Sequence, residues 1–100
     1  MIVGTTPTHT FNIPFDVSNI ATVRVIYAQN DNVVLTKTNE DCVLEDNTVN
    51  VTLTQEDTFL FDHTLPVEIQ LRILTVNGTS LGSIPKKVGV TKCLEDVVME

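Results

Sequence analysis

Residues 67–76 alternate apolar and polar side chains almost without a break. The apolar positions are Val67, Ile69, Leu71 and Ile73, and the positions between them are Glu68, Gln70, Arg72 and Leu74. A period of two places these two sets on opposite faces of a β-strand. One such strand cannot bury its apolar face alone, so the pattern requires a second packed layer. We expect this strand at the centre of a sheet.

Shorter runs of the same kind fill most of the remaining chain, and we expect strands at residues 8–13, 21–29, 33–38, 42–44, 48–54 and 79–84, with 88–91 extending the last. The 15 Val, 7 Ile and 15 Thr, against 2 Ala, favour strands over helices. Strands spaced near ten residues apart are typical of an immunoglobulin-like sandwich or a small barrel. We therefore expect one all-β domain over residues 1–100, an immunoglobulin-like antiparallel β-sandwich of about seven strands.

The expected strands are separated by turns and by one short helical turn. Asn30-Asp31-Asn32 and Asn77-Gly78 indicate hairpins, the second with a two-residue turn. Thr54, followed by acids in the next turn, predicts one short helical turn near residues 55–61. The core-facing positions that we expect are His9, Phe11, Ile13, Val23, Val25, Tyr27, Val49, Val51 and Leu53, with Phe59 and Phe61 plugging one end. The pattern leaves residues 92–100 open between strand, helix and tail.

Charge and segment patterns exclude several partners. Thirteen acidic residues against six Lys and Arg give a net charge of −7, which repels phosphate backbones and anionic membrane surfaces. We expect neither nucleic acid nor membrane as a partner. The sequence MIVGTTPTHT lacks the basic and apolar regions of a signal peptide, so we expect synthesis in a cytoplasm.

The residues that could carry chemistry form no recognisable constellation. His9 and His63 are the only histidines, and no serine stands in a GxSxG elbow. Cys42 and Cys93 lack the local pairing of a zinc site, which leaves free thiols or one disulfide open. Neither a calcium loop nor a phosphate-binding glycine motif is present. We expect no enzyme and no catalytic, metal or cofactor residues, and the pattern names no binding residues.

Four segments carry a resemblance to a known family. Residues 4–16 read GTTPTHTFNIPFD, residues 23–29 read VRVIYAQ, residues 53–58 read LTQEDT, and residues 67–78 end in Asn77-Gly78. In this order they resemble a family of phage and prophage proteins of gut Firmicutes, of about this length, whose members read GTTPTxTFxLP, VYVxxxQ and LTQEET. Strand order and the Leu-Thr-x-x-x-Thr segment are also similar to the amino-terminal immunoglobulin-like module of phage baseplate upper proteins.

The resemblance implies a non-catalytic structural or adaptor protein of the virion, associated with the tail, baseplate or neck. Its partners would be phage structural proteins, with copies arranged in a homo-oligomer. Baseplate upper proteins continue into long carboxy-terminal regions that this sequence does not contain, which favours a free-standing adaptor. Two alternatives stay open: a carbohydrate or host-surface binding module, and an acidic anti-defence inhibitor that mimics nucleic acid.

Overall fold

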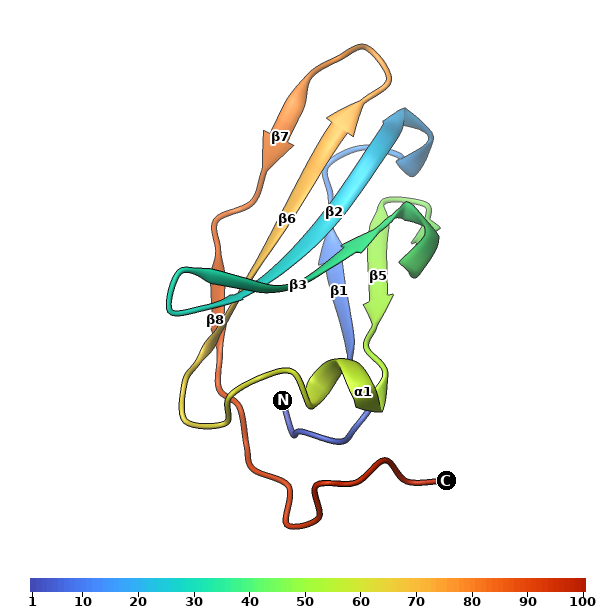
Figure 1. Ribbon diagram of the computed structural model, residues 1–100. Coiled ribbons are helices and arrows are strands. Elements are labelled where there is room, and N and C mark those ends of the chain that lie inside the picture. Colours follow the sequence, from blue (N-terminus) through green and yellow to red (C-terminus); the bar gives the residue numbers. More distant parts are fainter.

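The computed structural model describes residues 1–100 and consists of two antiparallel β-sheets packed face to face (Figure 1). The strands are β1 (Thr8–Asn12), β2 (Ile20–Gln29), β3 (Asn32–Thr38), β4 (Cys42–Glu45), β5 (Thr48–Thr52), β6 (Val67–Thr75), β7 (Ser80–Gly82) and β8 (Lys86–Val88). The larger sheet has the order β3-β2-β6-β7, with β8 also paired to β6, and the smaller has the order β1-β5-β4. The all-β sandwich expected from the sequence is confirmed.

The strand order identifies the sandwich as immunoglobulin-like. Immunoglobulin domains pair strands A, B, E and D in one sheet and C′, C, F and G in the other. In chain order, β1 to β6 match strands B, C, C′, D, E and F, and β7 and β8 together match G. The place of strand A, beside β1, holds no strand. Ile2 instead forms a parallel bridge to Thr91 beyond β8.

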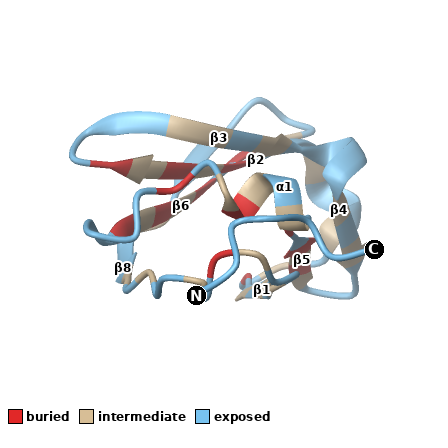
Figure 2. Cartoon of the chain, turned by 60° about the horizontal axis from the view of Figure 1, so that its bottom comes forward, coloured by how far each residue is buried: buried red, intermediate tan, exposed pale blue.

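The core lies between the two sheets and contains the inward positions that alternation predicts. Twelve buried side chains form one cluster, contributed mainly by β2, β5 and β6. Figure 2 shows these strands with buried positions, whereas β3, β4 and the carboxy-terminal segment have only intermediate and exposed positions. Tyr27 lies fully buried on β2, in the strand where antibody domains carry a buried Trp. The central position predicted for residues 67–76 is confirmed, because β6 pairs with β2 on one side and with β7 and β8 on the other.

Helix α1 (Gln55–Thr58) closes the end of the sandwich where both ends of the chain lie (Figure 1). Its capping box is complete: the Thr54 hydroxyl accepts from Asp57 N, and the Asp57 carboxylate accepts from Thr54 N. Phe61 is buried in the core as expected, and Phe59 is half-buried. The short helix expected near residues 55–61 is therefore confirmed, although it ends earlier.

Two local expectations were wrong. The Asn77-Gly78 turn has three residues rather than two, because Thr75 N donates to the Thr79 carbonyl and only Gly78 adopts a positive φ. The last strand is split into β7 and β8, because Ser83 Oγ accepts the bond from Leu71 N and Pro85 has no N–H to donate. Two polar connections contain 3₁₀ turns, η1 (Val17–Asn19) and η2 (Asn39–Asp41).

The carboxy-terminal residues 92–100 form neither a strand nor a helix. Cys42 and Cys93 are both free thiols and both half-buried. No helix of the structure has the length and the apolar character needed to cross a membrane.

Candidate functional site

The two histidines have different surroundings, and neither is paired with a nucleophile. His9 Nδ1 lies 2.8 Å from the Tyr27 hydroxyl between the sheets, as expected for a hydrogen-bonded histidine at the edge of the core. Burial lowers the pKa of His9, with a smaller contribution from the positive amino terminus, and burial raises the pKa of Tyr27. His63 is exposed in the loop before β6. This geometry gives His9 a packing role.

The other side chains that could carry chemistry either form hydrogen bonds within the fold or are exposed without a reactive neighbour. Ser83 accepts a hydrogen bond from a strand amide, and Ser80 lies on the exposed strand β7. Burial raises the pKa of the Cys42 thiol, which lowers its reactivity. No three His, Cys, Asp or Glu side chains lie close enough together to hold a metal ion.

The feature that stands out is the open edge of β1. Ile13 N donates to the Asn47 carbonyl, and Leu53 N donates to the Pro7 carbonyl, so the odd-numbered residues of this strand bond to β5. Because main-chain groups alternate in direction along an antiparallel strand, Thr8, Thr10 and Asn12 direct their N–H and C=O groups away from β5. No strand lies on that side. These groups therefore form an unpaired edge.

A cleft runs along this edge, between β1 and the facing strands of the larger sheet. It consists of two hollows in line, of about 210 and 280 Å³. The first is lined by Thr8, His9, Thr10, Phe11, Ile69, Lys86 and Val88. The second is lined by Asn12, Ile13, Pro14, Phe15, Leu71, Ile73, Leu81, Gly82 and Ser83. The same side of β1 thus borders a cleft from Thr8 to Phe15.

The two ends of the cleft differ in chemistry. The end near Ile13 and Leu81 is apolar, and Leu81 remains 41% exposed although it faces inward from β7. The end near His9 is lined in part by Lys86, which forms no ion pair. The cleft exists because the inner face of β7 and β8 extends past the smaller sheet, which has no strand to cover it.

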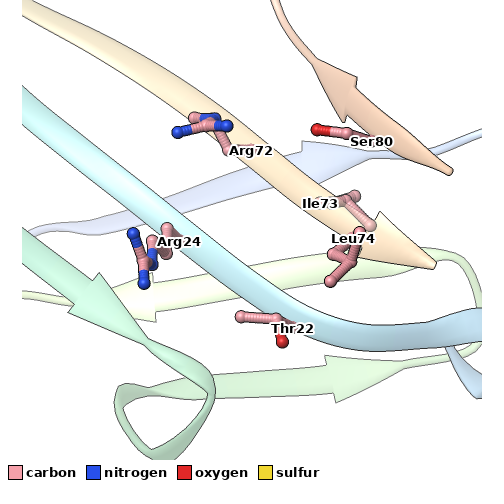
Figure 3. A pocket seen from close by; sticks show the side chains of 6 residues that line it. All are labelled: Thr22, Arg24, Arg72, Ile73, Leu74 and Ser80. Carbon is pink, nitrogen blue, oxygen red and sulfur yellow. The ribbon is translucent and has the colours of Figure 1, made fainter. Parts of the chain in front are cut away.

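A further hollow lies on the outer face of the larger sheet. Arg24 on β2 and Arg72 on β6 are direct cross-strand partners there, beside Thr22, Leu74 and Ser80 (Figure 3). The hollow has a volume of about 240 Å³. Neither arginine pairs with an acid, since the one ion pair of the structure joins Lys37 and Asp57. Like charges directly opposite each other destabilise a sheet.

No family model, curated protein or solved structure matches this chain. The alternation rule identifies the faces of a strand but not which of its edges is open, so the sequence did not reveal the cleft. One signal was available: Pro14 and Pro85 interrupt strands at its two walls, and proline in a sheet indicates edges.

Proposed function

We propose that this chain is a non-catalytic protein-interaction module that accepts an extended segment of a partner protein along β1. The observation that carries this proposal is the row of outward main-chain groups at Thr8, Thr10 and Asn12, directly beside an apolar cleft. In strand addition, main-chain hydrogen bonds provide affinity, and pockets for alternate side chains provide specificity. The β1 cleft offers both.

The shape of the cleft favours a strand over a small molecule. Small-molecule sites enclose most of their ligand in one concavity. Here two modest hollows follow the chain from Thr8 to Phe15. The five residues of β1 alone span about 17 Å in extended chain. An added strand would bring the smaller sheet from three strands to four and cover the inner face of Leu81.

The setting that we propose is a phage virion, where the chain acts as a structural adaptor of the tail, baseplate or neck. The support is the resemblance of residues 4–16, 23–29, 53–58 and 67–78 to small phage and prophage proteins. Virion assembly depends on protein contacts rather than catalysis, and the β1 cleft is a surface suited to such contacts.

The two alternative functions find less support. A sugar-binding face needs an exposed aromatic ring, but Tyr27 is fully buried and its hydroxyl is bonded to His9. A nucleic-acid mimic needs a continuous row of carboxylates. The thirteen acids of this chain are divided among the β1–β2 connection, the β2–β3 turn, η2, the β4–β5 hairpin, α1 and the loop after it, β6 and the carboxy-terminal segment.

The binding mode can be tested by selecting extended peptides from a random library on the purified protein. We expect the selected peptides to alternate apolar residues and to shift the amide resonances of Thr8, Thr10 and Asn12. The variant Thr10→Pro removes an outward N–H without touching a bond to β5, and it should lose this binding roughly tenfold or more. Thr10→Val is the matched control, because it loses the same side-chain bond to Asn50 but keeps the N–H. Peptides that bind Thr10→Pro and wild type equally would contradict the proposal.

The proposed setting has its own test. Particles purified from a lysate of the phage or prophage that encodes this chain should contain it in stoichiometric amounts by quantitative mass spectrometry. Its absence from complete particles and from assembly intermediates would overturn the virion assignment and leave the β1 binding mode untouched.

A further inference from the structure

Residues 94–100 carry apolar side chains that the molecule itself does not bury. Leu94 is 97% exposed, Met99 is 78% exposed and Val97 is 57% exposed, whereas Val98 is 39% exposed. The segment runs past α1 (Figure 1). Gln55 holds it there by two hydrogen bonds to Met99, one from Nε2 to the carbonyl at 3.0 Å and one from Met99 N to Oε1 at 2.7 Å. Both bonds are exposed, so the segment can leave this position at little cost.

The pattern of this segment matches the two ends of the β1 cleft. In an extended chain, Glu95, Val97 and Met99 share one face, with the acid at one end and the apolar side chains at the other. The cleft likewise presents Lys86 at its first end and apolar side chains at its second. The interval from Glu95 to Met99 equals that from His9 to Ile13, four residues or about 13 Å.

We propose that residues 94–100 of a second copy of this chain occupy the β1 cleft as an added strand, an inference that rests on the proposed function. Glu95 meets Lys86 beside His9, and Val97 and Met99 fill the apolar hollow near Ile13. The added strand therefore runs parallel to β1. Charge complementarity fixes this direction, because the reverse would place Glu95 in the apolar hollow and leave Lys86 unpaired.

This contact is heterologous, because the cleft and the segment are different surfaces of the same chain. Each copy then donates its segment to one neighbour and accepts the segment of another. Repetition of such a contact produces a closed ring or an open filament rather than a two-fold dimer. In its own molecule the segment is fixed at Thr91, which bonds to Met1 and Val3, and it lies outside the cleft.

The test is the solution mass of the full chain by sedimentation across a concentration series. Wild type should associate as concentration rises, and Val97→Asp should weaken association roughly tenfold or more, since it places a charge in an apolar hollow. Val98→Asp is the matched control, because it adds the same charge on the face directed away from the cleft, and it should associate like wild type. Circular dichroism must show all variants folded.

A mixing experiment then separates the two surfaces. Val97→Asp keeps an intact cleft and Thr10→Pro keeps an intact segment, so each alone should be mainly monomeric at a concentration where the wild type associates. Their mixture should form a one-to-one dimer that extends no further. The inference is overturned by a wild type that stays monomeric at every concentration, by association that Val97→Asp leaves unchanged, or by a mixture that forms no dimer.

These failures are distinguishable from failure of the proposed function. If the wild type is monomeric while library peptides still bind β1, the cleft accepts a different protein and only the choice of occupant is wrong. If neither the segment nor any peptide engages β1, the proposed function fails as well.

Discussion

His9 and Tyr27 form a polar pair between the two sheets, in which Tyr27 is fully buried and His9 is half-buried. His9 Nδ1 lies 2.8 Å from the Tyr27 hydroxyl, the two ring centroids lie 5.6 Å apart, and the Phe61 ring centroid lies 5.9 Å from that of Tyr27. The hydroxyl needs a partner when the ring is buried, and neutral His9 provides it. In antibody domains the corresponding strands carry one cysteine of the inter-sheet disulfide and the buried Trp.

The first prediction concerns the pH dependence of stability. Burial holds the pKa of His9 below its ordinary value of 6.5 in the folded state, so the unfolded chain binds more protons just below that pH. The contribution of neutral His9 to the free energy of unfolding should be complete above pH 6.5. The free energy of unfolding should then decrease as the pH falls from 6.5 toward the lower pKa of folded His9. Chemical denaturation at a series of pH values measures this slope. His9→Gln should flatten the slope in that window, and an unchanged slope would contradict the account.

Arg24 and Arg72 oppose each other on the outer face, and no acid offsets their repulsion. We predict that Arg72→Gln raises the free energy of unfolding by about 0.2–1 kcal/mol at low salt, because it removes a directly opposed like charge. The gain should shrink as salt screens the charges. Thermal unfolding of wild type and variant at two salt concentrations measures both effects. A lower melting temperature for the variant would show that Arg72 makes a stabilising contact instead.

At the scale of elements, α1 connects the two sheets. Lys37 on β3 pairs with Asp57 at 2.8 Å, and the same carboxylate accepts from Thr54 N. Burial alone would raise the pKa of Asp57, but the bonds from Lys37 and Thr54 outweigh it and lower the pKa. One half-buried carboxylate thus both caps the helix and holds it against the larger sheet.

We therefore predict that Thr54→Ala costs about 1 kcal/mol of unfolding free energy, because the amide of Asp57 loses its cap. Thr36→Ala, an exposed threonine on β3, is the control and should change stability far less. Urea denaturation compares the two variants. Equal losses of unfolding free energy in the two variants would mean that the Thr54 cap contributes no more than an exposed threonine on a strand.

Gln55 couples α1 to the carboxy-terminal segment. If the segment must leave Gln55 to reach a second copy, Gln55→Ala should strengthen self-association, because the competing bonds to Met99 are lost. Glu56→Ala, a neighbouring exposed position, should not. Sedimentation at matched concentrations decides the question, and weaker association of Gln55→Ala would contradict the proposed release.

At the scale of the whole molecule, a sheet of three strands packs against a sheet of five strands, in which β7 and β8 both pair with β6. Alternation predicted which side chains enter the core, since Val23, Val51 and Ile69 each repeat a local period of two. It could not predict the cleft, which depends on strand neighbours distant in sequence. β1 pairs with β5 on one side only. The chain before β1 does not pair with its other side, because Ile2 forms a bridge to Thr91 instead.

The central claim is that the outward groups of β1 form an open strand-accepting edge. The most direct measurement is amide hydrogen exchange by NMR along β1, at low concentration and under associating conditions. At low concentration the amides of Thr8, Thr10 and Asn12 should exchange fast, and those of His9 and Phe11, bonded to β5, should be protected. Association should then newly protect the amides of Thr8, Thr10 and Asn12. Protection of all five amides in the monomer would contradict the account. So would amides of Thr8, Thr10 and Asn12 that stay unprotected on association.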